Sequence, residues 1–282
     1  MKTLIIGEID NEARELLAKK TNVRQMSNDA FIKSDRLDCE ALVIRTFTRI
    51  GEKEICKMPD LKYIVSCSVG LDNIDIDELK RRNIELIFCQ GTNANSVAEH
   101  TIYLILKLIR EDVKKPFFEL KDKTIGLIGF GNIGKIVAEK LTGFGVKIIA
   151  SDVIKQEKEV LERLKVKMLD IEDIAKNSDI VSIHVPFNKY TDKLINEKIF
   201  SEMKESCFLV NTSRAEVIDE KALIKFSKIK KFRGIALDVY SEKLKKELNF
   251  GNIILTNHLA AQGEDSFKKM CLEPIQKFIS QV

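Results

Sequence analysis

The chain of 282 residues lacks the cysteine and histidine spacings that mark metal centres and redox motifs. Its six cysteines are scattered, no Cys-x-x-Cys pair occurs, and none stands at metal-ligand spacing from one of the three histidines. Most of these cysteines lie in or beside apolar runs, where a free thiol behaves as a small hydrophobic group. We therefore expect no metal site and reduced cysteines, which is typical of a cytoplasmic protein.

Long apolar segments and an excess of one charge are missing as well. Met1 and Lys2 lead directly into the strand-like run Leu4–Ile6, so we expect no signal peptide, and no later run predicts a membrane helix. The 47 basic and 43 acidic residues nearly cancel, which leaves a net charge of +4. This balance gives no basic surface for nucleic acid, and the lysine-rich stretches Lys225–Lys231 and Lys243–Lys246 are expected to be solvated.

The sequence does contain an alternation of short apolar runs with helical patterns, over a length typical of two domains or of one large α/β domain. In the first third, the predicted strands are Thr3–Ile6, Ala41–Ile44, Tyr63–Ser66 and Glu85–Phe88, and the predicted helices are Asn11–Lys19, Glu52–Lys57 and Ile76–Arg82. The apolar segment Ser96–Arg110 predicts a buried connecting helix, and the charged segment Glu111–Lys123, which contains Pro116, predicts a linker.

A second alternating series follows this linker. Its predicted strands are Thr124–Ile128, Val146–Ala150, Asp179–His184, Cys207–Asn211, Gly234–Leu237 and Asn252–Leu255. Its predicted helices are Asn132–Thr142, Glu157–Leu164, Ile171–Lys176, Asp219–Phe226 and Glu264–Ile279. Such alternation favours parallel sheets with helices on both faces. If the last helix folds back onto the first half, the first domain is discontinuous.

A glycine-rich loop lies between the first strand and the first helix of the second series. The run Gly129-Phe130-Gly131-Asn132-Ile133-Gly134 matches the G-x-G-x-x-G pattern in the strand–turn–helix context that gives this pattern its meaning. The first glycine allows the tight turn, the second lets the backbone approach a pyrophosphate, and the third lets the helix pack closely on the strand. The free N–H groups of the helix N-terminus then bind the phosphates. We therefore predict a dinucleotide site.

An acidic residue follows the next strand. Asp152 lies 18 residues beyond Gly134, where a carboxylate accepts hydrogen bonds from the adenosine ribose and repels a 2′-phosphate. This position favours NAD over NADP, although Lys155 keeps the choice open. The alternatives are a structural turn with a helix-capping aspartate, or a methyltransferase, which also uses a glycine-rich loop.

Polar residues follow three later strands of the second series: Arg214 after the fourth, Asp238 after the fifth and His258 after the sixth. In a doubly wound sheet the carboxyl ends of the strands face the ligand. An arginine binds a carboxylate in a bidentate fork, and a histidine exchanges the proton of a hydroxyl near neutral pH. Together with a nicotinamide these are the groups that reduction of a 2-keto acid needs, whereas a methyltransferase does not explain Arg214 and His258.

These residues occur in a series of motifs that resembles the D-isomer-specific 2-hydroxyacid dehydrogenases over nearly the whole chain. The motifs are Ser68–Asp75, Ser96–His100, Gly129–Gly134 with Asp152, His184–Pro186, Met203-Lys204, Asn211–Arg214, Ala236–Tyr240 and Thr256–His258. The resemblance implies an α/β protein of two doubly wound parallel-sheet domains. A Rossmann cofactor domain, 94–263, would be inserted in a flavodoxin-like substrate domain formed by 1–93 plus 264–282. It also implies NAD as cofactor, a small anionic 2-hydroxy or 2-keto acid as substrate, and a homodimer formed through the cofactor domain.

The resemblance also assigns roles to single residues. Arg214 would bind the substrate carboxylate and keto oxygen, and His258 would be the general acid in reduction and the base in oxidation. Val69 and Gly70 would bind the carboxylate through backbone N–H groups, and Asp238 would touch the nicotinamide amide. The full cofactor set is Gly129, Gly131, Asn132, Ile133, Gly134, Asp152, His184, Val185, Pro186, Thr191, Thr212, Ser213 and Asp238, and the substrate set is Arg45, Ser68, Val69 and Gly70.

The chain departs from the family pattern at the third catalytic group. The family's glutamate stands five residues beyond the aspartate of the Leu-Asp-Val-Tyr run, where this chain has Lys243, and Glu242 lies one residue earlier. We favour Glu242 as the carboxylate that orients His258. If Lys243 faces the histidine instead, the proton donor is weakened. The chain would then be an NAD(H)-sensing binding protein on the same scaffold. The linker is also shorter than is usual in the family, so a dimer arm would be reduced.

Other polar residues have simpler interpretations. His184 is expected to line the cofactor site through its backbone, and His100 to serve packing or capping of its helix. Arg45 either guides the anionic substrate or forms a loop salt bridge, and both readings stay open. Asp72 and Asp75 are expected to cap the helix that begins at Ile76.

Overall fold

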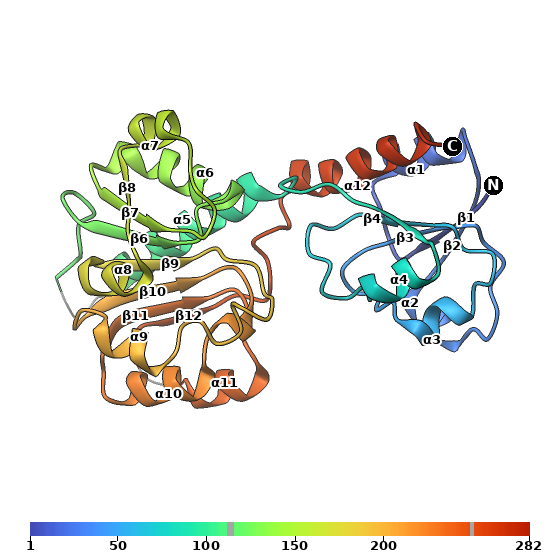
Figure 1. Cartoon of the computed structure of the whole chain (residues 1–282). Helices are drawn as coiled ribbons and strands as arrows, with labels where there is room; N and C mark the ends of the chain where they lie inside the picture. Colours follow the sequence, from blue (N-terminus) through green and yellow to red (C-terminus); the bar gives the residue numbers. More distant parts are fainter. Residues whose placement is uncertain (112–115, 249–250) are drawn as a thin grey trace. The chain divides into compact units, whose positions relative to one another are not determined.

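The computed structural model describes residues 1–111, 116–248 and 251–282. The chain forms two compact units, one made of residues 1–93 with 262–282 and the other of residues 94–261 (Figure 1). Each unit is built on one parallel sheet, as the alternating pattern predicts. The predicted fold class, with one α/β domain inserted in another, is confirmed.

The smaller unit has a five-stranded sheet in the order β2-β1-β3-β4-β5, which is the flavodoxin-like arrangement. Its strands are β1 (Lys2–Ile6), β2 (Asn22–Met26), β3 (Ala41–Ile44), β4 (Tyr63–Ser66) and β5 (Glu85–Ile87). Its helices are α1 (Asn11–Ala18), α2 (Asn28–Lys33), α3 (Glu52–Cys56), α4 (Ile76–Arg81) and α12 (Glu264–Ile279). The expected discontinuity of this unit is therefore real, because the last helix of the chain packs on the first sheet.

Two layers of helices bury the faces of this sheet. Leu17 of α1 packs with Ile275 and Phe278 of α12 against Ile5 and Val65 on one face. Residues of α2, α3 and α4 cover the other face (Figure 1). Each face of the sheet is thus covered by an apolar core.

The sequence pattern does not predict β2 and α2. The strand Asn22–Met26 pairs only with β1 and is mostly exposed, so it lacks both the apolar run and the strict alternation that predict a strand. The short helix α2 buries only Phe31 and is capped by the Ser27 hydroxyl, which accepts a hydrogen bond from the Ala30 amide. Tertiary pairing and one cap stabilise elements that the local pattern does not indicate.

The larger unit has a seven-stranded parallel sheet in the order β12-β11-β10-β9-β6-β7-β8. Its strands are β6 (Thr124–Ile128), β7 (Lys147–Ser151), β8 (Val166–Met168), β9 (Ile180–Ile183), β10 (Cys207–Asn211), β11 (Phe232–Leu237) and β12 (Ile253–Leu255). Six of these strands were predicted, and the edge strand β8, which has three residues, was not. The chain reverses its direction of winding between β6 and β9, and such a switch point is where doubly wound folds bind ligands.

Helices cover both faces of the larger sheet. They are α5 (Ala94–Glu111), α6 (Asn132–Leu141), α7 (Lys158–Leu164), α8 (Ile171–Asn177), α9 (Glu197–Glu202), α10 (Glu220–Lys228) and α11 (Glu242–Glu247), with 3₁₀ turns at Thr142–Phe144 and Ala215–Val217. Helices α5, α6 and α7 share one core, and α8, α9, α10 and α11 share the other. The short charged helices α9 and α11 were not predicted. Part of the predicted linker, residues 112–115, lies outside the described residues, and Glu111 belongs to α5.

Candidate active site

The carboxyl ends of the strands in the larger sheet form one edge at which the predicted residues gather. Ile128 of β6 pairs with Ser151 of β7 and Ile183 of β9, and across the sheet Asn211, Leu237 and Leu255 are aligned in the same way. The loops that carry the glycines, Asp152, His184, Arg214, Asp238 and His258 all leave the sheet at this edge. One row of loops therefore holds the predicted cofactor-binding and proton-transfer groups.

The glycine loop has the geometry that a pyrophosphate needs. Gly129 has a φ of 101°, and a Cβ there would lie 2.7 Å from the backbone carbon of His184. A Cβ at Gly134 would lie 2.3 Å from the carbonyl oxygen of Gly129, so neither position has room for a side chain. At Gly131, by contrast, a Cβ would meet no described atom within 4 Å, and no described side chain caps α6 there. Asn132 and Ile133 then open the helix, so its first N–H groups face a site that fits a dinucleotide phosphate.

Asp152 joins the glycine loop to the end of β7. Its Oδ2 accepts a hydrogen bond of 2.7 Å from the Phe130 amide, and its Oδ1 accepts one of 2.8 Å from the Ile154 amide. A carboxylate has further acceptor sites beyond these two bonds, so Asp152 can hold the loop and still bind ribose hydroxyls. The turn-forming alternative and the ribose-binding role are compatible.

The loop after β9 is fixed by its own hydrogen bonds. The His184 amide donates to the Ile128 carbonyl at 2.7 Å, and the His184 Nε2 lies 2.9 Å from the Ser182 hydroxyl. Burial lowers the pKa of His184 to about 4, so its ring is neutral near pH 7 and is no proton donor for catalysis. Further along, the Thr191 hydroxyl donates to the carbonyl of Pro186 at 2.6 Å, which closes the loop that begins at Val185.

The loop that carries Arg214 is held by Asn211 and by α5. The Asn211 Oδ1 accepts hydrogen bonds from the amide and the hydroxyl of Ser213, and its Nδ2 donates to the Arg214 carbonyl at 2.9 Å. The Thr212 hydroxyl lies 2.9 Å from that of Thr101 on α5. The half-buried Arg214 therefore starts from a fixed backbone, as a residue that clamps a carboxylate must.

Asp238 holds the loop that carries His258. Its buried carboxylate accepts hydrogen bonds from the Thr256 hydroxyl and from the amides of Leu259 and Ala260, and its carbonyl accepts one from the His258 amide. Burial alone would raise the pKa of Asp238, but these hydrogen bonds and one from His100 hold it below its usual range. His258 itself is exposed, with a φ of 53°. Beyond the packing or capping expected from the sequence, the His100 ring reaches these loops.

The two candidates for the third catalytic group, Glu242 and Lys243, are the first two residues of helix α11. The hydroxyl of Ser241 caps this helix by accepting from the Leu244 amide, and Glu220 in turn accepts from the Ser241 amide and hydroxyl. Glu242 and Lys243 both have exposed side chains in the first turn. The choice of Glu242 over Lys243 stays a prediction.

The predicted substrate residues of the smaller unit lie at the carboxyl ends of β3 and β4. The Arg45 guanidinium lies 4.6 Å from the centre of the Phe267 ring, and its buried Nε has no hydrogen-bond partner among the described residues. The Ser68 hydroxyl lies 2.9 Å from that of Ser66 and 3.3 Å from the Gly70 carbonyl, and Val69 is half-buried between them. Asp75 caps α4 as predicted, by accepting from the Glu78 amide at 3.0 Å.

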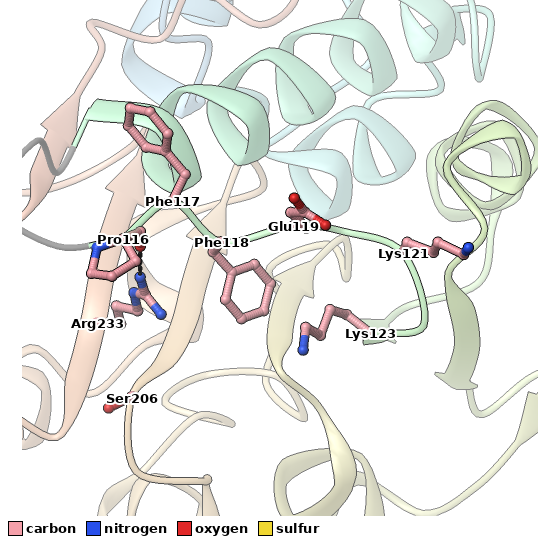
Figure 2. Close-up of a pocket in the computed structure, with 8 residues that line it drawn as sticks. All are labelled: Pro116, Phe117, Phe118, Glu119, Lys121, Lys123, Ser206 and Arg233. Atoms are coloured by element: carbon pink, nitrogen blue, oxygen red, sulfur yellow. Dashed lines mark hydrogen bonds between the residues drawn. The ribbon is translucent and has the colours of Figure 1, made fainter.

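A hollow of about 640 Å³ lies at the opposite edge of the larger sheet (Figure 2). It is lined by Lys123 and Ser206, which precede β6 and β10, and by Arg233 near the start of β11. The cations of Lys123 and Arg233 both lie over the Phe118 ring, and Arg233 also donates to the Pro116 carbonyl. Because these cations already have partners and the predicted groups lie at the other edge, we assign this hollow no part in the reaction.

The described residues contain no cluster of three or more histidine, cysteine, aspartate or glutamate side chains placed to hold a metal ion. Within the same residues, no helix is long and apolar enough to cross a membrane.

The larger sheet and its glycine loop define a dinucleotide-binding α/β protein of the Rossmann type. Residues 94–260 match the family model described as the D-isomer specific 2-hydroxyacid dehydrogenase, NAD binding domain. The chain belongs to this family, and its cofactor is NAD. Family membership removes the methyltransferase alternative.

Similar proteins agree with this assignment over most of the chain. Hydroxypyruvate reductase of Thermotoga maritima is 32% identical over 97% of this chain and 96% of its own length. Glyoxylate reductase of Thermofilum pendens is 34% identical over 83% of this chain and 75% of its own length. Among solved structures, D-lactate dehydrogenase from Aquifex aeolicus, complexed with NAD and lactic acid, has a TM-score of 0.85 at 27% identity and covers 98% of this chain and 94% of that one.

Sequence reasoning missed the polar contacts that α5 makes with the loops of the site. Ser96 donates to the Ala260 carbonyl at 2.7 Å, and His100 and Thr101 reach Thr256 and Thr212. The signal in the sequence is that Ser96 and His100 belong to one of the motifs that carry the family resemblance.

Proposed function

We propose that the protein transfers a hydride between NAD(H) and C2 of a small 2-keto or D-2-hydroxy acid. The row of loops at one sheet edge supports this proposal most directly, because it places the glycine loop, Arg214 and His258 after strands of the same sheet. The names of the two similar reductases favour glyoxylate or hydroxypyruvate as the substrate to test first. In this assignment 94–263 form the cofactor domain, and 1–93 with 264–282 form the substrate domain.

The residues of this chain would divide the work as follows. Arg214 binds the substrate carboxylate and polarises the keto oxygen, because its guanidinium offers a planar fork of donors. His258 gives its proton to the developing hydroxyl in reduction and takes it back in oxidation. When NAD(H) is bound, its nicotinamide supplies or accepts the hydride. Glu242 orients His258.

The remaining residues would bind and orient the two ligands. Gly129, Gly131, Asn132, Ile133 and Gly134 hold the pyrophosphate, and Asp152 holds the ribose. The loops at His184–Pro186, Thr191, Thr212–Ser213 and Asp238 flank the nicotinamide half, and Arg45, Ser68, Val69 and Gly70 bind the substrate. Asp152 also favours NAD over NADP, because its carboxylate repels a 2′-phosphate.

The test mixes the protein with NADH and with glyoxylate, hydroxypyruvate, pyruvate and 3-phosphohydroxypyruvate in turn, and follows the loss of NADH absorbance. We expect turnover with at least one of these acids and a clear preference for NADH over NADPH. If NADH does not bind, or if it binds and no acid is reduced, the proposed reaction is wrong.

A second candidate function rests on Lys243. A cation at the family's glutamate position would weaken proton donation, and the chain would then bind NAD(H) as a sensor with little catalysis. Tight binding of NADH without turnover would favour this alternative. Replacing Lys243 by Glu separates the two, since a sensor should gain activity whereas an enzyme that uses Glu242 should change little.

We further propose that the protein is a homodimer formed through the cofactor domain, and that it works in the cytoplasm. Tyr103 is 48% exposed on α5, where it lines an open hollow with Ile102 and Leu106. Glu99, Lys107 and Glu111 line the same hollow, and an exposed surface of apolar and charged side chains suits a contact between two copies. All six cysteines are free, which fits a reducing compartment. Sedimentation of the purified protein tests the dimer, and Tyr103→Glu should shift it to the monomer.

A further inference from the structure

The loop that carries His258 does not hold its shape by itself. It has no regular secondary structure, and His258 adopts a φ of 53°, a left-handed conformation that is uncommon for residues other than glycine. The exposed imidazole must nevertheless keep one direction to transfer a proton to a bound substrate. The contacts that fix this loop therefore matter for the function proposed above.

Asp238 is the centre of these contacts. Its carboxylate is 0% exposed and spans the loop from Thr256, at 2.5 Å, to the amides of Leu259 at 2.8 Å and Ala260 at 3.0 Å. Its own carbonyl accepts from the His258 amide at 2.8 Å. The carboxylate of Asp238 thus holds residues on both sides of His258, and its backbone carbonyl holds the His258 amide.

The remaining contact of this carboxylate comes from a different element. The His100 Nε2, on α5, lies 3.4 Å from the Asp238 Oδ1 and 3.2 Å from the Thr256 hydroxyl oxygen. The hydroxyl of Thr256 has one proton, which it donates to the ionised Asp238. The His100 Nε2 must therefore carry a proton and donate it to this pair of acceptors.

The position of His100 is itself fixed. Its ring packs on Tyr103 one helical turn later, with ring centroids 5.7 Å apart, and Ser96 one turn earlier donates to the Ala260 carbonyl at the far end of the same loop. Helix α5 also contacts the loop of Arg214 through Thr101 and Thr212. One helix therefore anchors both loops that carry the proposed proton-transfer and carboxylate-binding groups.

We propose that His100 is a positioning residue for His258. Its Nε2 proton completes the hydrogen bonds of Asp238 and Thr256, and these fix the backbone from which the His258 imidazole projects. This inference rests on the proposed function, in which His258 transfers the proton. It predicts a defect in proton transfer and none in cofactor binding.

The test compares His100→Leu, which removes the donor, with His100→Gln, whose amide N–H₂ can replace it. We expect His100→Leu to lower kcat at least about tenfold, while KM and the NADH dissociation constant change less than about twofold. His100→Gln should recover most of the lost kcat. Glu99→Gln, a change at an exposed residue of the same helix whose carboxylate contacts Asn95 and Lys140, is the matched control and should behave like the wild type.

A second readout does not depend on turnover. The chain has only three histidines, so the imidazole signals in an NMR spectrum can be assigned by single replacements. In His100→Leu the His258 signal should move toward the value of an unstructured peptide, and the His184 signal should stay in place. Should His100→Leu prove unstable, Thr256→Val removes the hydroxyl between the two groups and is expected to give the same signature.

Two results would overturn the proposal: a His258 signal and a kcat that do not respond to His100→Leu, or a His100→Gln variant that is as impaired as His100→Leu. Failure of the proposed function looks different, because the wild-type protein itself would then reduce no keto acid.

Discussion

In both units the first strand ends at a glycine with a positive φ, Gly7 at 78° after β1 and Gly129 at 101° after β6, and a helix follows. The two helices then differ at their N-termini. Asp10 caps α1, and its own carboxylate accepts a hydrogen bond from the Ala13 amide. Gly131 occupies the same position before α6, and no described side chain caps that helix.

The N-terminus of α1 is therefore closed by a side-chain cap, whereas that of α6 is open, within the same architecture. A carboxylate at an N-cap accepts from one of the free N–H groups and occupies the place that a phosphate would take. Without one, the N–H groups of α6 and the positive end of its dipole are free to bind the pyrophosphate of NAD. The doubly wound fold offers the site twice, and single residues decide which copy is used.

The largest expected effect comes from giving the second helix the cap of the first. Gly131→Asp places a carboxylate beside the bound pyrophosphate, and the repulsion and lost space should lower the affinity for NADH on the order of 100-fold or more. The fold should be unaffected, because a Cβ at this position meets no described atom within 4 Å. Binding is measured by the fluorescence of NADH, and the melting temperature is followed in parallel.

The matched control is Gly143→Asp, since Gly143 also has open space around its Cβ but lies in the 3₁₀ turn after α6. It should bind NADH like the wild type. Equal affinity in Gly131→Asp and the wild type would mean that the pyrophosphate binds elsewhere.

The next prediction compares the two edges of the larger sheet. Arg214→Ala at the carboxyl edge should lower kcat/KM on the order of 100-fold, because a bidentate contact to a charged group contributes about 3 kcal/mol. The NADH dissociation constant should stay the same. Arg233→Ala at the amino edge, where the side chain contacts Pro116 and Phe118, should leave kcat/KM unchanged. A loss of less than about tenfold for Arg214→Ala would contradict its role.

A third prediction concerns His184, which has no counterpart in the smaller unit. Its pKa is about 4 in the folded protein and near 6.5 when unfolded, so between these values the unfolded chain binds more protons. The free energy of unfolding should therefore increase by about 3 kcal/mol as the pH rises through this window. The same amount of stability is lost when the pH falls through it. Urea unfolding at pH values from 4 to 7 measures the slope.

The control for this slope is His184→Gln, which cannot titrate. Across the same pH window, its free energy of unfolding should change by about 3 kcal/mol less than that of the wild type. Identical slopes in the two proteins would show that folding does not lower the pKa of this ring.

The smallest effect is expected at the closed helix end. Asp10→Ala removes the cap of α1 and should lower the free energy of unfolding by about 1 kcal/mol. The affinity for NADH should not change, because this helix belongs to the other unit. Glu15→Ala, at an exposed position of the same helix, is the control for the loss of a charge. A change in NADH affinity in Asp10→Ala would contradict the division of roles between the two helix ends.

Much of the fold could be predicted from local patterns. The strands β3, β4, β6 and β10 and the helix α12 have the predicted bounds, because buried strands and long amphipathic helices each repeat an apolar spacing. The missed elements, β2, β8, α2, α9 and α11, lie at sheet edges or on the surface. Their stability comes from a neighbouring strand or a single cap, and no short sequence pattern records such contacts.

The candidate site divides in the same way. The order of the motifs along the chain determined which residues follow which strands, and this was enough to predict the glycine loop, Arg214, Asp238 and His258 at one edge, since parallel strands end together. The role of His100 could not be predicted, because residues 100, 238 and 256 are far apart in sequence and meet only through the packing of α5.

The sequence by itself determined the class of fold, the dinucleotide loop and the family, because these depend on spacings within short segments. The tertiary structure alone decided which polar groups share hydrogen bonds, that desolvation lowers the pKa of His184, and that Asp238 holds the His258 loop. Hydrogen bonds and desolvation depend on distances between atoms, and only the folded chain brings distant residues within those distances.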